Sequence, residues 1–166
     1  MLEAIIVTGT PGTGKTTLTK LLQKEGYIVL DVGKLVVEEK LYDSYDKERQ
    51  SYVVNDKKLR RYLIKELEQN LTDLPLILDG HVMRLPPRFI SHCIVLRCSI
   101  RNLRQRLEER DYSEPKIDEN VEAEIMEVIL TDMLNLYGDK KVTVISTDGS
   151  IEDSFEKLLL VLDQIK

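Results

Sequence analysis

The sequence has no apolar run long enough to cross a bilayer, and its N-terminus lacks the basic, apolar and small-residue succession of a signal peptide. It also contains no internal repeat, low-complexity segment or linker. We therefore expect a soluble, cytoplasmic protein with no membrane partner. With 166 residues, of which 42% are hydrophobic and 32% charged, the chain suits one compact domain, residues 1–166.

Cysteine and histidine are scarce. The two cysteines, Cys93 and Cys98, lie five positions apart in an apolar stretch, which is not the spacing of a metal or redox pair. His81 and His92 add no metal-ligand spacing either. We therefore interpret both cysteines as small apolar residues of the core.

Positive charge is in deficit. The chain has 24 Lys and Arg residues against 29 Asp and Glu residues, for a formal net charge of −5. A protein that grips nucleic acid alone usually has a basic face. This chain would need a local concentration of basic residues, or a protein partner, to reach RNA. One such concentration exists, with five arginines between positions 97 and 110.

Short apolar segments alternate with segments of helical period. The sequence predicts strands over 2–8, 27–30, 76–78, 90–96 and 141–146. It predicts helices over 15–24, 32–41, 56–71, 100–110 and 118–136, and a last helix capped by Ser150 with Asp153. Residues 42–54 and 111–116 are polar and lack a clear period. This alternation is typical of a parallel sheet covered on both faces, in which ligands bind beyond the carboxyl ends of the strands.

Residues 9–16 read GTPGTGKT, between the first predicted strand and the first predicted helix. Glycines let the backbone curl its N–H groups around a phosphate chain, and the helix start adds free N–H groups and a positive dipole end. Lys15 would place its charge on the β- and γ-phosphates, and Thr16 would offer its hydroxyl to Mg²⁺. The alternative is a glycine-rich turn with a solvated lysine. The position between strand and helix favours a phosphate-binding (Walker A) loop for ATP. The expected nucleotide-binding residues are Gly12, Thr13, Gly14, Lys15, Thr16 and Thr17.

Asp79 ends the third predicted strand, where P-loop enzymes place a second acidic group near Mg²⁺. The competing interpretation is an ordinary Asp-Gly turn. We expect Thr16 and Asp79 to be the metal-binding residues. His81 follows two positions later. From spacing alone, His81 is equally compatible with positioning a water, contacting a phosphate or simple packing.

The arginines of the 100–110 helix precede the polar loop 111–116. Arginines that close over a nucleotide stabilise the charge of phosphoryl transfer. The alternative is a solvated helix face paired with Glu108, Glu109 and Asp111. Arg110, nearest to the loop, is the best candidate for both nucleotide binding and catalysis.

Residues 9–17, with Leu18, look like the P-loop of the nucleoside monophosphate kinases. Residues 31–35 (DVGKL) and 38–46 (EEKLYDSYD) are similar to one branch of them, the adenylate kinase isoenzyme 6 family, also called the coilin-interacting nuclear ATPase group. Asp79-x-His81 resembles the Walker B element of that family.

The resemblance continues into the second half of the chain. Residues 106–112 (RLEERDY), 116–120 (KIDEN) and 123–125 (AEI) resemble the lid and the helix that follows it. The match covers nearly the whole chain in the same order. It favours a functional interpretation of His81, so the expected catalytic residues are Lys15, Asp79, His81 and Arg110.

This resemblance implies a P-loop NTPase with a Rossmann-like, three-layer α/β/α fold and a five-stranded parallel sheet in the order 2-3-1-4-5. It implies a monophosphate-binding segment near 31–54 and a lid near 109–119. The implied activity is adenylate kinase, transfer of phosphate from ATP with Mg²⁺ to AMP or a related monophosphate, together with ATP hydrolysis. It also implies a role in late maturation of small-subunit ribosomal RNA, through transient pre-ribosome contact and a platform protein, ribosomal protein eleven of the small subunit.

Three departures from the family stand out. Some relatives carry an arginine where this chain has Val36-Val37, and Asp111 stands where relatives often have glycine, a change expected to alter lid mobility. Residues 138–150 do not align clearly, so no adenine contact carries over. The absence of the longer tail of some eukaryotic relatives favours an archaeal source.

Two other functions stay open. One is an ATPase that times assembly of the small ribosomal subunit, with a vestigial monophosphate site. The other is a small-molecule kinase on the same fold, although the tyrosine-rich loop 42–52 has only Arg49 for reading a carboxylate. A GTPase is disfavoured because the sequence contains no Asn-Lys-x-Asp element.

Overall fold

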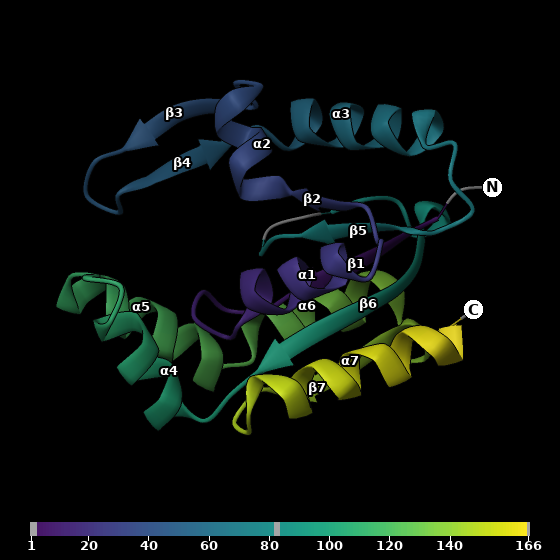
Figure 1. The fold of residues 1–166 in the computed structure, drawn as a ribbon. Coiled ribbons are helices and arrows are strands. Elements are labelled where there is room, and N and C mark those ends of the chain that lie inside the picture. The colour runs from purple at the N-terminus through teal and green to yellow at the C-terminus, as the bar shows by residue number, and fades with distance from the viewer. Residues whose placement is uncertain (1–2, 82–83, 166) are drawn as a thin grey trace.

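A computed structural model describes residues 3–81 and 84–165 (Figure 1). Leu2, within the first predicted strand, lies outside this part of the chain. Five parallel strands form the central sheet in the order β2-β5-β1-β6-β7. Their bounds are Ala4–Thr8 for β1, Val29–Asp31 for β2, Leu76–Asp79 for β5, Ile90–Arg97 for β6 and Val142–Ser146 for β7. Counted among these five strands alone, the order is the predicted 2-3-1-4-5.

Seven α-helices and two short 3₁₀ helices surround the sheet in the described residues. The α-helices are α1 (Lys15–Lys24), α2 (Val32–Glu38), α3 (Asp56–Gln69), α4 (Ile100–Glu108), α5 (Glu114–Ile125), α6 (Val128–Tyr137) and α7 (Ile151–Ile165). The 3₁₀ helices are η1 (Pro87–Phe89) and η2 (Asp139–Lys141). The predicted cap of the last helix is confirmed, because the N–H of Asp153 donates to Oγ of Ser150 at 3.0 Å.

Side chains that alternate along the strands build one core on each face of the sheet. In β1, Ala4 and Ile6 pack with the apolar residues of α2, α3 and α6, whereas Ile5 and Val7 pack with those of α1 and α7. A third, smaller core joins α4 to α5. The result is three layers, with α4 and α5 forming an arm beyond the carboxyl end of the sheet (Figure 1).

Both cysteines are core residues, as predicted. Cys93 and Cys98 are free thiols and are buried. Burial raises the pKa of Cys93 to about 12. Within the described ranges, no helix has the length and apolar character needed to span a membrane.

The polar segment 42–54 is ordered, although its sequence lacks a clear period. It forms an antiparallel hairpin of β3 (Tyr42–Asp46) and β4 (Ser51–Val54). The Asp46 carboxylate accepts from the N–H groups of Glu48 and Arg49 at 2.9 and 3.0 Å, which fixes the turn. The hairpin lies at the same end of the sheet as α4 and α5 (Figure 1), and an ion pair of 3.8 Å joins Arg49 to Glu119 of α5.

The single helix predicted over 118–136 is wrong. The helix is interrupted at Met126 and Glu127, which separate α5 from α6, and Glu127 has a left-handed φ of 54°. The predicted loop 111–116 is also too long, because α5 already begins at Glu114. Pro115 stands in the first turn of α5, where proline is compatible with a helix because its missing N–H has no intrahelical partner.

Candidate active site

The loop between β1 and α1 has the backbone geometry of an anion cradle. Gly14 adopts φ 97° and ψ 14° just before α1, a conformation that costs other residues energy. An added Cβ at Gly14 would meet no atom within 4 Å. Gly12 instead packs closely, because a Cβ there would lie 3.0 Å from Leu103 of α4. The first turn of α1 thus faces open space while α4 supports the loop from behind.

Thr13 differs in orientation from its neighbours. Its side chain is fully buried, and both its N–H and its hydroxyl donate to the carbonyl of Thr10, at 3.2 and 2.7 Å. Thr16 and Thr17, by contrast, are exposed at the start of α1. Thr13 therefore holds the loop in shape, and Thr16 and Thr17 stand where a ligand would reach them.

Lys15 folds back onto the loop. Its Nζ donates to the carbonyl of Gly9 at 2.7 Å and to that of Thr10 at 3.2 Å. Burial lowers the pKa of Lys15 to about 8, and Asp79 opposes this shift while the charge of Arg110 adds to it. At neutral pH most molecules therefore carry a charged Lys15 ammonium beside the phosphate-binding loop.

Asp79 is 5% exposed at the end of β5. Its carboxylate accepts from the Thr19 hydroxyl of α1 at 2.7 Å. Burial raises the pKa of Asp79, against the opposing influence of this hydrogen bond and of Lys15. Thr16 and Asp79 line the same cavity, and a hydroxyl with a carboxylate is the oxygen donor set that Mg²⁺ prefers. The residues present therefore fit a magnesium ion.

His81 lies on the surface, two residues beyond β5, and also lines this cavity. Its partial removal from water, with the charges of Lys15 and Lys116, holds the pKa of His81 below its ordinary value. The imidazole is therefore neutral at pH 7 and retains a nitrogen that accepts a hydrogen bond.

Two cavities meet at the P-loop. The larger, about 490 Å³, runs between the start of α1, the end of α4 and the loop that leads into α7. The smaller, about 190 Å³, lies between the P-loop, β5 and the start of α2, and Lys15, Thr16, Asp79 and His81 line it. Gly12 and Arg110 line both.

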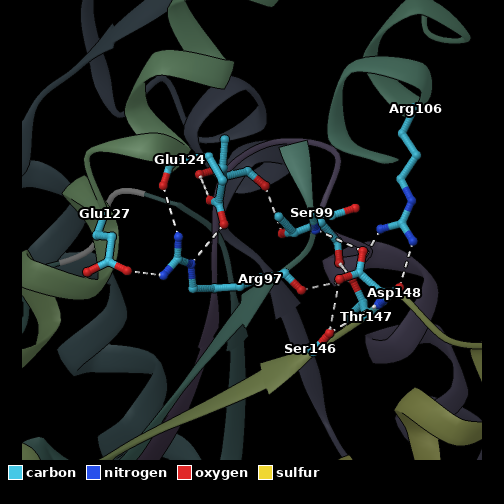
Figure 2. Close-up of polar contacts among 10 residues, drawn as sticks. Arg97, Ser99, Arg106, Glu124, Glu127, Ser146, Thr147 and Asp148 are labelled. Atoms are coloured by element: carbon cyan, nitrogen blue, oxygen red, sulfur yellow. Dashed lines mark hydrogen bonds and ion pairs between the residues drawn. The ribbon is translucent and has the colours of Figure 1, made fainter. Parts of the chain in front are cut away.

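The arginines between positions 97 and 110 divide between structural and cavity positions. Arg97 pairs with the buried Glu124 and with Glu127. Arg106 donates to the carbonyl of Thr147 at 2.6 Å, as Figure 2 shows, and to the carbonyl of Gly12 at 3.3 Å.

Arg104 and Arg110 contrast with each other. Arg104 pairs with Glu114 and Asp118 of α5, rather than with the neighbours named in the solvated-face alternative. Arg110 is exposed at the end of the arm and faces both cavities.

Sequence reasoning missed several residues of this site. Thr147 lines the larger cavity, and its hydroxyl donates to the carbonyl of Thr13 at 2.8 Å. Asp31 pairs with Asp79 across β2 and β5 and lines the smaller cavity. Asp31 ends β2 and Thr147 directly follows β7, so their positions at the carboxyl edge of the sheet were the available signal.

Glu124 carried no such signal, because its contacts with Thr10 and Arg97 span 114 and 27 residues of sequence.

Comparison with known proteins gives a consistent result. Residues 5–127 match the family model described as "AAA domain". The chain is 37% identical over 157 residues to "Putative adenylate kinase" of Methanocaldococcus jannaschii, which covers 93% of this chain and 83% of the relative. It is 32% identical over 166 residues to "Adenylate kinase isoenzyme 6 homolog" of Caenorhabditis elegans, covering 98% and 90%.

Solved structures agree on the fold. TT1252 from Thermus thermophilus superposes with a TM-score of 0.64 at 20% identity, over 100% of both chains. Deoxyadenosine kinase from M. mycoides, with bound dATP, gives 0.57 at 15% identity, covering 97% of this chain and 99% of its own. At these identities the likeness shows the fold alone. The sequence matches carry the assignment further: this chain belongs to the adenylate kinase isoenzyme 6 family of P-loop proteins.

Proposed function

We propose that this protein is a nucleoside monophosphate kinase of the adenylate kinase type, which transfers phosphate from ATP to AMP. The observation that carries the proposal is the pair of cavities that meet at Gly12 and Arg110. A phosphotransferase with two nucleotide substrates needs a donor site and an acceptor site that share the transferred phosphate. The larger cavity suits the donor nucleotide, and the smaller suits the acceptor phosphate.

Each proposed residue has a role that follows from its place. N–H groups at the start of α1 bind the donor phosphates, and Lys15 moves from the loop carbonyls to neutralise them. Thr16 and Asp79 would hold Mg²⁺, which when bound offsets the charge of the phosphates. Arg110, between the two cavities, would stabilise the charge on the phosphate in transit.

A coupled assay tests this proposal. Purified protein with ATP and Mg²⁺ is incubated with each nucleoside monophosphate in turn, and ADP production is compared with that in the absence of an acceptor. We expect AMP to give the fastest transfer. Absence of transfer to every monophosphate would contradict the kinase assignment. Unchanged nucleotide affinity in Lys15→Ala would contradict the P-loop assignment itself.

ATP hydrolysis is the second candidate activity, and the position of His81 favours it. A neutral imidazole at the edge of the phosphate cavity can accept a hydrogen bond from water, and Asp79 lies in the same cavity. We expect His81→Ala to reduce hydrolysis more than phosphate transfer. Equal losses in both reactions would instead indicate a general role in phosphate binding.

The role in small-subunit ribosome maturation rests on the family resemblance. We propose transient contact with the pre-ribosome through ribosomal protein eleven of the small subunit. Cytoplasmic location stays a prediction. Binding of the purified protein to that ribosomal protein, and small-subunit rRNA maturation in cells that carry Asp79→Ala with His81→Ala, are the direct measurements. Normal rRNA maturation in cells with the double variant would contradict the proposed role in ribosome maturation.

A further inference from the structure

Glu124 is a buried carboxylate that the proposed mechanism does not use. It lies in the last turn of α5 and is 4% exposed. One carboxylate oxygen accepts from the hydroxyl of Thr10 at 2.6 Å, and the other accepts from Nε of Arg97 at 2.9 Å. Figure 2 shows the Arg97 side chain reaching toward Glu124 and Glu127. Burial of an ionised group is costly unless it is paired, and here both oxygens have partners.

Thr10 connects this carboxylate to the phosphate site. Its side chain donates to Glu124, and its carbonyl accepts from Thr13 and from Nζ of Lys15. Thr10 is 2% exposed, so the loop has little room to adjust around it. The position of the Glu124 carboxylate therefore sets the position of the carbonyl that receives Lys15.

The same helix leads to the lid. α5 begins at Glu114, four residues after Arg110, and ends at Ile125, one residue after Glu124. Ile117 and Val121 fix α5 against α4 through a buried core. Arg97 fixes its far end, because its guanidinium also bonds the Glu124 carbonyl at 2.9 Å and pairs with Glu127 at the helix break.

We propose that Glu124 is a positioning residue for phosphoryl transfer, which holds Thr10 and with it the P-loop in register with helix α5. The inference rests on the proposed kinase function. An apolar contact would hold a helix against a loop without the cost of desolvating a carboxylate. A hydrogen-bonded carboxylate also fixes the orientation of its partner. A site that holds a phosphate chain in place for reaction requires such a fixed orientation.

The test compares variants at both ends of the Thr10–Glu124 hydrogen bond. Thr10→Val removes the hydroxyl at nearly constant size, Thr10→Ser keeps it, and Glu124→Gln removes the charge. Glu122→Gln, at an exposed position of the same helix, is the matched control. We expect Thr10→Val and Glu124→Gln each to lower kcat by about tenfold or more, with a smaller change in KM for AMP. We also expect Thr10→Ser to restore most of kcat and the control to match the wild type.

Three outcomes would overturn the proposal: wild-type kcat in Thr10→Val, equal loss in Thr10→Ser and Thr10→Val, or additive losses in the Thr10→Val, Glu124→Gln double variant. Coupled residues should give a double variant little worse than the worse single one. If Glu124→Gln does not fold, the Thr10 pair alone decides. If the wild type transfers phosphate to no monophosphate, the kinase function fails separately. The same variants are then judged by their affinity for ADP with Mg²⁺, where unchanged affinity in Thr10→Val sinks the proposal.

Discussion

The protonation of Lys15 offers a sharp test of the phosphate site. Burial lowers the pKa of this residue from 10.5 to about 8 in the nucleotide-free protein. A bound diphosphate would place several negative charges beside the ammonium and raise that pKa again. Binding above pH 8 should therefore require the uptake of a proton by Lys15, and binding at pH 7 should not.

The size of the effect follows from the pKa. One unit above it, at about pH 9, only about one molecule in eleven carries the charged lysine, so affinity should fall roughly tenfold relative to about pH 7. The sign is fixed, because the nucleotide-free protein holds this proton less tightly than the complex does. Affinity should thus decline as pH rises through the pKa of the free protein.

Calorimetric titration with ADP and Mg²⁺ at pH 7, 8 and 9 measures the affinity directly. Repeating each titration in two buffers of different ionisation enthalpy gives the number of protons taken up. In Lys15→Arg the guanidinium does not titrate in this range, so the pH dependence should flatten whatever its affinity. Equal affinity at pH 7 and pH 9 without proton uptake in the wild type would refute the reasoning.

Three further predictions concern the scaffold of the site. Gly14→Ala should cost about 1–2 kcal/mol, measured by thermal unfolding, because the left-handed backbone and not crowding opposes the new Cβ. Leu103→Ala should lower the free energy of unfolding in urea by about 2–5 kcal/mol, because this fully buried side chain supports the P-loop from α4. A thiol reagent should label neither Cys93 nor Cys98 in the native protein and both after unfolding, because burial raises the pKa of each. An unchanged stability in either variant, or rapid native labelling, would contradict the corresponding packing.

The sheet was predictable because the short apolar segments that indicate strands are also the segments that the fold buries. In β1 every residue is buried, as expected of a strand between two helical layers. The P-loop was predictable for the same reason. Its glycines, the strand before it and the helix after it all indicate the same loop conformation. The cap at Ser150 is equally local, spanning three residues.

The hairpin and the helix break depend on signals that a local pattern does not contain. The turn between β3 and β4 has no glycine, and Gln50 takes the left-handed φ of 49° instead. Tyr42 and Tyr52 come together, with ring centroids 4.6 Å apart, only once the hairpin has closed. At the break, Glu127 adopts a left-handed conformation where Arg97 of β6 pairs with Glu124 and Glu127. Such contacts between distant segments decide the local geometry against propensity.

The arginines between positions 97 and 110 have different roles because their side chains have different partners. Arg97 and Arg104 meet carboxylates, so their charges are already balanced within the protein. Arg106 donates to carbonyls and a hydroxyl, and it joins the P-loop to Thr147, the residue that directly follows β7. Among the described residues, no hydrogen bond or ion pair engages the Arg110 side chain, although it lines both cavities. Its charge lowers the pKa of Lys15, so the two cations repel each other across the site. A polyphosphate between them would replace that repulsion with two attractions, which is why we expect the anion, rather than a protein carboxylate, to complete this site.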